Sequence, residues 1–420
     1  MALIVQKFGG TSVGTIARIQ HVACAVLDAR EKGDDIVLVV SAMAGETNRL
    51  IQFATEINPI PDSREYDLLI SSGEQIAVGL VTLAINTEAE KRGLLKEGRP
   101  VARGLLGHQI GIFTDSVFSK ARIQAIDTTL LTNDIAVRVI PVIAGFQGVD
   151  FEHNITTLGR GGSDTSAVAI AIALKASDCE IYTDVDGVYT TDPRLCREAR
   201  KIKKISYEEM MELASLGAKV LQIRSVELAA KYQLPLHVRS SFSQEEGTRV
   251  VSKEALGQQL EQVVVAGVAA DVGQVKFTLQ NLPDQPGVVA QVFVALSAAS
   301  IVVDVIVQDI AMNGLLALSF TVGKTDFLKT GIILQELKRN YFSSMRIVEE
   351  EKLAKVSIVG VGMQHHPGVA SQMFQLLAQA DINIKLITTS EIKISCLIPE
   401  VAVKRAVECL HLGFGLHCAE

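Results

Sequence analysis

Hydrophobic positions in the first 250 residues form short runs that alternate with amphipathic stretches. The runs are rich in Val and Ile, and most of them end in Gly, Ser, Thr or Asp. This alternation is typical of a sheet covered by helices on both faces, and ligands of such sheets bind beyond the carboxyl ends of the strands. The pattern predicts strands at residues 3–8, 36–41, 136–143, 155–158, 180–184 and 235–239, and helices at 16–30, 74–87, 163–174 and 207–213.

After Gly247 the pattern changes and an internal repeat begins. Residues 284–293 align without gaps to residues 365–374, and the Pro-Gly pair of each copy gives an offset of 367 − 286 = 81. Each copy reads as strand, Pro-Gly turn, amphipathic helix, strand, hairpin, strand and helix, and Asn313-Gly314 is a strong hairpin signal in the first copy. Two such α+β modules either merely pack together or form an effector site at their interface, and we favour the effector site.

Composition and charge exclude several classes of protein. The 40 Lys and Arg residues against 47 Asp and Glu give a net charge of −7, which argues against a nucleic-acid partner. The longest apolar runs, such as 76–85 and 263–270, fall short of the roughly 18 residues of a membrane-spanning helix. The N-terminus lacks a signal peptide, and the six cysteines are far apart and form no C-x-x-C pair. We therefore expect a cytoplasmic protein without a membrane partner.

The loop after the first predicted strand is suited to hold phosphate. The sequence has no P-loop, protein-kinase or dinucleotide fingerprint. Lys7 is followed by Gly9 and Gly10, whose missing side chains let backbone N–H groups approach phosphate oxygens, and a helix start follows. The alternative is a tight turn between strand and helix with an exposed lysine.

A second glycine-rich loop, residues 158–166, also leads into an apolar helix. Ser163, Asp164 and Thr165 are suited to cap that helix, but three glycines and Arg160 within five residues exceed what capping needs. The guanidinium of Arg160 suits a carboxylate clamp. Asp164 could orient the phosphate-binding lysines or hold a metal-bound water.

Further acidic candidates remain ambiguous. Residues 182–194 follow a buried strand and suit a nucleoside pocket, with Thr183 and Asp184 near the base or ribose, but a β-turn with solvated acids fits as well. Glu74 begins a predicted helix, where a glutamate is common because of the helix dipole alone. Ligand binding by Glu74 and a purely structural role at the helix start are therefore two equal interpretations.

Six segments together resemble the aspartate kinase family, of the amino-acid-kinase fold. The repeats around Pro286-Gly287 and Pro367-Gly368 resemble tandem ACT domains, the amino-acid-sensing modules of such kinases. The resemblance covers nearly the whole chain, and residues 7–12 and 389–395 would rarely occur together in another family. The six segments are residues 7–14, 40–43, 71–75, 159–166, 182–187 and 217–221.

The resemblance implies a fold and a domain organisation. We expect a three-layer α/β amino-acid-kinase domain with a mainly parallel central sheet over residues 1–248. A linker at 249–262 would then lead to two ferredoxin-like ACT domains, at 263–343 and 344–420.

The resemblance also implies a reaction, the ATP-dependent phosphorylation of the side-chain carboxylate of L-aspartate to 4-phospho-L-aspartate. This is the first step towards lysine, threonine and methionine, with Mg²⁺ expected through the ATP phosphates and no metal site of the protein itself. Lys7 and Asp164 would serve phosphoryl transfer. Arg160 would bind the α-carboxylate and Glu74 the ammonium, with Thr47 and Ser163 as further aspartate contacts. The implied ATP contacts are Lys7, Gly9, Gly10, Thr11, Ser12, Ser41, Thr183, Asp184, Tyr189, Arg194 and Lys219.

Regulation by lysine, threonine or both follows from the same resemblance. The first repeat would contribute Asp284, Gly287, Asp304 and Gln308, facing Asn383 and Ile384 of the second, with Thr389 and Glu391 in a matching second pocket. We expect at least a homodimer through the ACT domains, with a shorter regulatory chain as a further possibility.

One position departs from part of the family. Gln222-Ile223 stands where many relatives have His-Pro, and we expect this to affect the loop on the ATP side and not the chemistry. Two alternatives stay open. One is an enzyme of the same fold acting on glutamate, acetylglutamate or a nucleoside monophosphate, and the other is an amino-acid sensor whose kinase domain has decayed.

Overall fold

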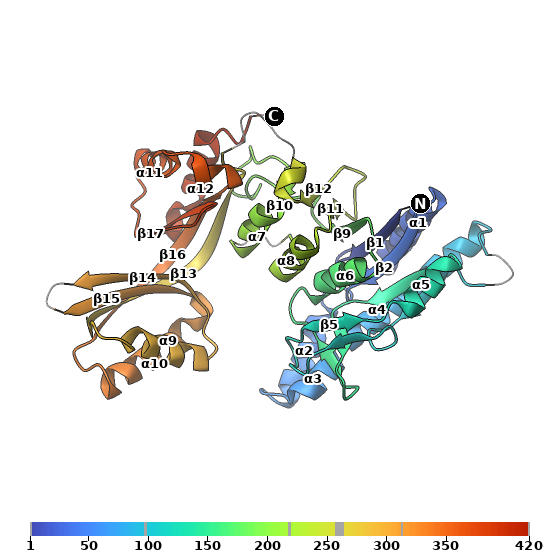
Figure 1. Cartoon of the computed structure of the whole chain (residues 1–420), viewed down its shortest axis with the longest axis horizontal. Helices are drawn as coiled ribbons and strands as arrows, with labels where there is room; N and C mark the ends of the chain where they lie inside the picture. The colour runs from blue at the N-terminus through green and yellow to red at the C-terminus, as the bar shows by residue number, and fades with distance from the viewer. Residues whose placement is uncertain (1, 96–98, 217–219, 257–263, 312–313, 419–420) are drawn as a thin grey trace. The chain divides into compact units, whose positions relative to one another are not determined.

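The computed structural model describes residues 2–95, 99–216, 220–256, 264–311 and 314–418. The chain divides into two compact units (Figure 1). The N-terminal unit contains Met1–Tyr189 and Lys201–Leu260, and the C-terminal unit contains Thr190–Arg200 and Glu261–Glu420. The excursion of Thr190–Arg200 into the C-terminal unit is a feature that the sequence pattern did not predict. The domain limits expected from the sequence stay a prediction.

The N-terminal unit is built on a mainly parallel sheet. Among the described residues this sheet has eight strands in the order β10-β12-β11-β9-β1-β2-β6-β3, and only the β11–β12 pair is antiparallel. Its strands are β1 (Leu3–Phe8), β2 (Asp35–Val40), β3 (Ala102–Leu105), β6 (Ile140–Ala144), β9 (Asp178–Thr183), β10 (Lys204–Ser206), β11 (Leu236–Ser240) and β12 (Thr248–Val251).

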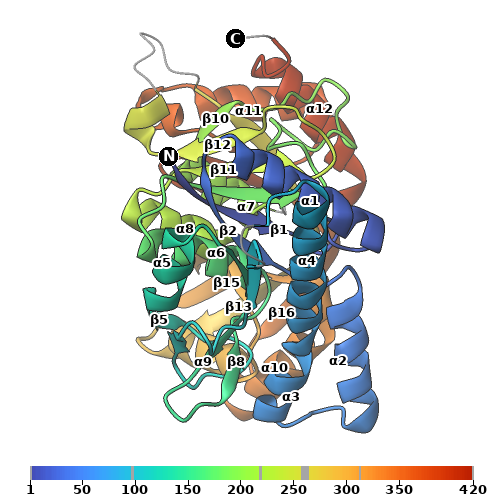
Figure 2. The same cartoon turned by 90° about the vertical axis from the view of Figure 1, so that its right-hand side faces the viewer.

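Helices cover both faces of the sheet. Helices α1 (Ile16–Glu31) and α4 (Ser72–Lys91) pack together on one face, where they lie side by side in Figure 2. Thr15 caps α1 through its side chain, and the buried residues Ile19, Val22 and Val26 form the stripe that packs on Leu38 of β2. The opposite face carries α6 (Gly162–Ala173), α7 (Tyr207–Ser215) and α8 (Ile223–Tyr232). The expected three-layer α/β class with a mainly parallel sheet is confirmed.

Smaller elements complete the N-terminal unit. Within its described residues a second sheet has the order β5-β4-β7-β8. The expected strand at 136–143 is partly wrong, because α5 extends to Ala136 and β6 begins only at Ile140. The remaining elements are α2 (Glu46–Ile57), α3 (Ser63–Ile70), β4 (Ile112–Thr114), β5 (Ile123–Ile126), α5 (Thr129–Ala136), β7 (Gln147–Val149), β8 (Ile155–Thr157) and a 3-10 turn at Lys253–Leu256.

One helical stretch is apolar and long enough to cross a membrane by composition alone. It spans Ser63–Lys91 and joins α3 to α4, and 44% of its most apolar window is buried. Ala77, Val81 and Ile85 of this stretch lie in the core against α1 and the sheet. Packing in the core therefore accounts for part of its apolar composition, while Ile76 and Leu83 of the same helix are exposed.

The C-terminal unit contains two βαββα modules that share one antiparallel sheet. In the described residues the order is β14-β15-β13-β16-β18-β17, so β13 and β16 join the modules at the centre and β14 and β17 form the edges. The first module has β13 (Gly267–Pro283), α9 (Val288–Ala298), β14 (Val303–Ala311), β15 (Leu315–Gly323) and α10 (Phe327–Asn340). The second has β16 (Arg346–Val359), α11 (Val369–Gln379), β17 (Leu386–Thr389), β18 (Lys393–Pro399) and α12 (Val403–Gly413), and short 3-10 turns lie at Lys324–Asp326, Val361–His365 and Glu400–Ala402.

The repeat read from the sequence matches the observed modules. Gly287 and Gly368 cap α9 and α11 with φ values of 94° and 104°, which glycine adopts without strain. The antiparallel pair β14–β15 forms the predicted hairpin, although Asn313 of its turn lies outside the described residues. In the second module the core also includes Cys196, from the segment Thr190–Arg200.

Candidate active site

The carboxyl ends of the central strands meet at one edge of the eight-stranded sheet. Because β1 pairs in parallel with β2, and β2 with β6, the loops after Phe8, Val40 and Ala144 are neighbours. Backbone hydrogen bonds continue beyond the strands. The Ser41 N–H donates to the Phe8 carbonyl (3.1 Å) and the Gly145 N–H to the Val40 carbonyl (3.0 Å). A ligand of this type of sheet binds at this edge.

Among the described helices, α2, α4 and α6 begin at this edge, because residues of their first turns line one pocket there. The residues before α2 and α6, Gly45 and Gly161, have φ values of 85° and 73°. Glycine adopts this left-handed conformation without steric cost. The first N–H groups of a helix lack intrahelical partners and carry partial positive charge. The pocket is therefore electrostatically suited to anions such as phosphate and carboxylate.

Lys7 and Asp164 form a buried ion pair at the centre of this edge. Lys7 lies near the end of β1 and Asp164 in the first turn of α6, and Lys7 Nζ is 2.6 Å from Asp164 Oδ1. Their side chains are 11% and 10% exposed. Asp164 thus fixes the position of the ammonium group at the mouth of the glycine loop after β1.

Glycine at position 10 allows that loop to approach the loop after β2. The Ala44 N–H donates to the Gly10 carbonyl (3.1 Å). A Cβ atom at position 10 would lie 2.7 Å from the Ala42 carbonyl oxygen, closer than atoms can pack. The two loops that bring Lys7 and Ser41 to the pocket are therefore held together only because residue 10 has no side chain.

Glu74 is a buried carboxyl group in the first turn of α4. Its Oε1 atom accepts the Ala42 N–H at 3.0 Å, and its residue is 3% exposed. Its Oε2 atom is buried and has no hydrogen-bond partner among the described residues. Burial raises the pKa of Glu74 to about 7, against the effect of the hydrogen bond from Ala42. A buried carboxyl oxygen without a partner can accept a hydrogen bond from a ligand that enters the pocket.

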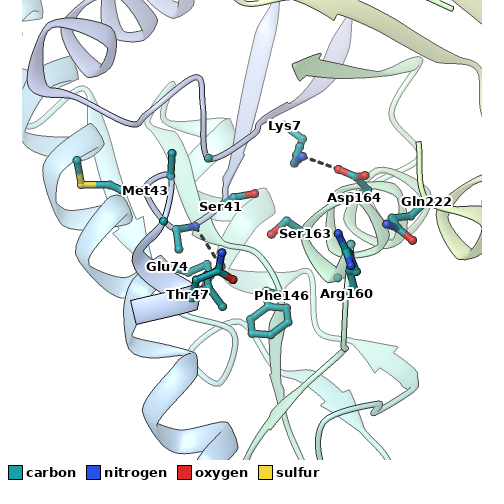
Figure 3. A pocket seen from close by; sticks show the side chains of 17 residues that line it. Lys7, Ser41, Met43, Thr47, Glu74, Phe146, Arg160, Ser163, Asp164 and Gln222 are labelled. Atoms are coloured by element: carbon teal, nitrogen blue, oxygen red, sulfur yellow. Dashed lines mark hydrogen bonds and ion pairs between the residues drawn. The ribbon is translucent and has the colours of Figure 1, made fainter. Parts of the chain in front are cut away.

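Arg160 and Ser163 lie across the pocket from Glu74 (Figure 3). Arg160 is exposed, and within the described part of the chain its guanidinium has no hydrogen bond or ion pair. Ser163 is close to Gly145, where a Cβ atom would lie 2.8 Å from Ser163 Oγ. Arg160 thus keeps all its donors available for a ligand carboxylate.

The pocket that these residues share has a volume of about 360 Å³. This size suits a small ligand together with the terminal phosphates of a nucleotide. The predicted site residues that line it are Lys7, Gly10, Ser41, Thr47, Glu74, Arg160, Ser163 and Asp164, and the other lining residues include Met43, Asn48, Phe146 and Gln222.

Comparison with known proteins assigns the family. Residues 2–240 match the model of the amino acid kinase family and residues 356–414 that of the ACT domain. The chain is 50% identical to the aspartokinase of Pseudomonas aeruginosa over 416 residues, which cover 99% of this chain and 98% of that protein. The chain belongs to the aspartokinase family.

Solved aspartokinase structures have the same fold. The crystal structure of E. coli aspartokinase III in complex with aspartate and ADP (R-state) matches with a TM-score of 0.77 and 27% identity, covering 98% of this chain and 99% of that chain. The structure of the same enzyme with lysine and aspartate (T-state) matches with the same TM-score, identity and coverage. The resemblance inferred from the sequence motifs is confirmed.

Several ATP contacts implied by the aspartokinase motifs lie beside the pocket and not in its lining. The Gly9 N–H donates to the Tyr182 carbonyl (3.1 Å), and Ser12 Oγ hydrogen-bonds to Ser241 Oγ. The Ser241 N–H donates to the Thr183 carbonyl (2.9 Å). These bonds tie the loop after β1, which also contains Thr11, to the end of β9. A nucleotide role for these residues stays a prediction.

The other ATP contacts expected from the family have different surroundings. The Thr183 hydroxyl donates to Asp184 Oδ1 (3.2 Å), and the Tyr189 hydroxyl donates to Asp186 Oδ1 (2.9 Å). Arg194 belongs to the C-terminal unit and pairs with Asp192 at 2.7 Å. Lys219 lies outside the described residues. Their roles in this aspartokinase stay predictions.

The expected effector residues lie on several elements of the C-terminal unit. Asp304 and Gln308 are on β14, and Asp304 pairs with the buried Lys355 of β16. Asp284 and Gly287 lie between β13 and α9, Asn383 and Ile384 precede β17, and Thr389 ends it, followed by Glu391. Within one chain β14 and β17 are opposite edges of the sheet. The first repeat was expected to face Asn383 and Ile384 of the second. Pairing of β14 with β17 in one chain does not bring these residues together.

Sequence reasoning missed pocket residues that follow strands. Phe146 comes directly after Gly145 at the end of β6, and Met43 follows β2. The rule that ligands bind after strand ends could have found both. Gln222 was singled out as a family departure, but its side chain lines the pocket beside Arg160, closer to the chemistry than expected.

Proposed function

We propose that this aspartokinase transfers the γ-phosphoryl group of ATP to the side-chain carboxylate of L-aspartate, which yields ADP and 4-phospho-L-aspartate. The observation that carries the proposal is the convergence of Lys7, Asp164, Glu74 and Arg160 on one pocket. The names of the relatives and the aspartate and ADP bound to E. coli aspartokinase III support it.

Aspartate has three charged groups, and the pocket offers a complementary group for each. The unpaired Oε2 of Glu74 would bind the ammonium group, and Arg160 would bind the α-carboxylate as a fork. Thr47 and Ser163 line the same pocket and would supply hydroxyl groups to the substrate. The side-chain carboxylate would then point to Lys7, where the γ-phosphate would lie.

Phosphoryl transfer to a carboxylate needs positioning and cations more than acid–base chemistry. The attacking oxygen is already ionised at neutral pH, so no general base is required. Lys7 and the positive end of the α6 helix dipole would stabilise negative charge on the equatorial oxygens. Asp164 would hold Lys7 in place, because the pair is buried and its atoms are in contact.

Magnesium would enter the site with the nucleotide. Among the described residues no group of three or more His, Cys, Asp or Glu side chains could hold a metal ion. Mg²⁺ keeps several waters and takes phosphate oxygens as ligands, so one protein carboxylate is enough. Asp164 fits this role through a metal-bound water, and bound Mg²⁺ would neutralise charge on the phosphates.

An acceptor assay tests the proposal. The chain should form ADP from ATP with aspartate, and not with glutamate or acetylglutamate, in a coupled assay. Turnover with glutamate and none with aspartate would instead support the alternative enzyme of the same fold. The Lys7→Ala variant should lose phosphoryl transfer while keeping its fold. Near-normal turnover of this variant would remove Lys7 from the mechanism.

Regulation and assembly belong to the C-terminal unit. We infer that lysine, threonine or both inhibit through the ACT modules, supported by the lysine bound to E. coli aspartokinase III. Because β14 and β17 are opposite edges, we infer that two copies of the chain supply the two halves of each effector site, with a cytoplasmic homodimer as the smallest assembly. Titration of activity with lysine, threonine and their mixture, combined with sedimentation, tests both inferences.

A further inference from the structure

Gln222 has a position that neither capping nor core packing explains. It immediately precedes α8, and its side chain crosses the backbone of Gly161. A Cβ atom at Gly161 would lie only 1.7 Å from Gln222 Cγ and 2.3 Å from Cδ. The side chain therefore lies flat on the glycine that precedes α6. Its amide end is directed to the pocket, which Gln222 lines.

The start of α8 is fixed to the glycine-rich loop after β8. Arg224 donates from its two terminal nitrogens to the Leu158 carbonyl (2.7 Å) and the Ala121 carbonyl (3.0 Å). Ser225 donates from its hydroxyl to the Gln222 carbonyl at 2.7 Å. The position of Gln222 relative to Arg160 and Gly161 is thus set by hydrogen bonds before any ligand binds.

The Gln222 amide lies between two residues of opposite charge. Figure 3 shows it between Asp164 and Arg160, at the side of the pocket opposite Glu74. Within the described part of the chain no hydrogen bond to this amide is present. A neutral amide carries two N–H donors, and a carboxylate bound by Arg160 keeps lone pairs that one guanidinium does not use.

We propose that Gln222 is a further aspartate-binding residue of this enzyme, whose amide N–H donates to the substrate carboxylate held by Arg160. The inference rests on the proposed function, because it takes aspartate as the substrate. The aliphatic part of the Gln222 side chain packs on Gly161 and so fixes the position of the amide in the pocket. Gln222 and Arg160 together then orient the α-carboxylate, which directs the side-chain carboxylate to Lys7.

Two substitutions separate the amide from the stem. Gln222→Met keeps the length of the side chain and its contact with Gly161 but removes the donors. Its KM for aspartate should rise about tenfold, as expected for a lost hydrogen bond to a charged group, while kcat and the KM for ATP change by less than about threefold. Gln222→Glu keeps the shape but adds a negative charge beside the substrate carboxylate, so its KM should rise further than that of the Met variant. Glu227→Gln, on the exposed side of α8, is the matched control and should leave all three constants unchanged.

The outcomes distinguish this inference from the proposed function. A Gln222→Met variant with the KM of the wild type for aspartate would overturn the inference, as would a rise in the KM for ATP alone. If circular dichroism shows that the Met variant does not fold, the KM of the Gln222→Glu variant for aspartate is compared with the wild type instead, and an unchanged value would overturn the inference. Absence of aspartate turnover in the wild-type chain would instead refute the proposed function.

Discussion

The raised pKa of Glu74 gives the sharpest prediction for catalysis. The folded chain holds this carboxyl at a pKa of about 7 because it is buried, whereas an exposed glutamate titrates near 4.5. Binding of an ammonium group requires the ionised form. At saturating ATP the kcat/KM for aspartate reports the enzyme–ATP complex before aspartate binds, so it should level off above about pH 8 and approach a tenfold fall per pH unit below about 6. The charges of aspartate itself do not change between about pH 5 and 7.5.

The perturbation is Glu74→Gln, assayed at saturating ATP. This variant cannot pair with the ammonium group, so its kcat/KM at pH 8 should be lower by roughly a hundredfold or more, as for the loss of one partner of a buried ion pair. Its pH profile should be flat where the wild type declines. Glu90→Gln, on the exposed side of the same helix, should keep the wild-type profile. A break near pH 7 that persists in Glu74→Gln would refute the assignment, because another group would then cause it.

The same pKa shift makes a linked prediction for stability. The folded state holds the Glu74 proton between about pH 4.5 and 7, where the unfolded state has lost it. The stabilising contribution is therefore complete below about 4.5 and lost as the pH rises through about 7. The shift of about 2.5 pKa units corresponds to about 3 kcal/mol. The free energy of unfolding of the wild type relative to Glu74→Gln should decrease by roughly that amount from pH 5 to pH 8 in denaturant titrations.

Three further predictions follow from the geometry. Gly10→Ala should lower kcat at least about tenfold, because its Cβ would meet the Ala42 carbonyl. Gly79→Ala on α4, where the added Cβ has open space, should keep its activity and raise the free energy of unfolding by about 1 kcal/mol. Equal rates of the two variants would contradict the steric argument. Asp67→Ala should lower the free energy of unfolding by roughly 3 kcal/mol or more, since Asp67 accepts four hydrogen bonds of 2.7–3.0 Å from Ser119 and Thr157, and denaturant titration checks it. Asp304→Ala should raise the lysine or threonine concentration for half-inhibition at least about tenfold; unchanged inhibition curves would place the effector elsewhere.

Patterns of local sequence were sufficient for the long elements and failed for short ones. The segments of β1 and β2 are continuous apolar runs rich in β-branched residues, and the apolar residues of α1 have helical spacing. The local sequence alone therefore predicts each of these elements. The run at 136–143 is ambiguous, because a short apolar segment fits a helix end as well as a strand. Residues 129–136 form α5, whose Asp134 reaches Arg103 on β3 at 3.4 Å. That contact depends on the tertiary fold and is invisible in the local pattern.

The candidate site shows a similar division. Lys7 near the end of β1 and the two glycines that follow the strand indicate a phosphate loop, because these residues are neighbours in the sequence. Glu74 left two equal interpretations, since a glutamate at a helix start also satisfies the helix dipole without a ligand. Its environment comes from Ala42, 32 residues away, and from burial by the packed unit. The position of β14 and β17 at opposite edges of their sheet is likewise visible only in the strand order of the fold.

The charges of the pocket explain why a triply charged substrate suits it. Lys7 and Asp164 neutralise each other, and the helix N-termini of α2, α4 and α6 add partial positive charge to that of Arg160. The pocket therefore favours anions, while burial holds the pKa of Glu74 at about 7. In the proposed complex, the two substrate carboxylates would pair with the positive groups, and the substrate ammonium would stabilise the ionised form of Glu74. We therefore expect a dicarboxylate without an ammonium group to bind more weakly than an amino acid, because no cation would then stabilise the buried Glu74 carboxylate.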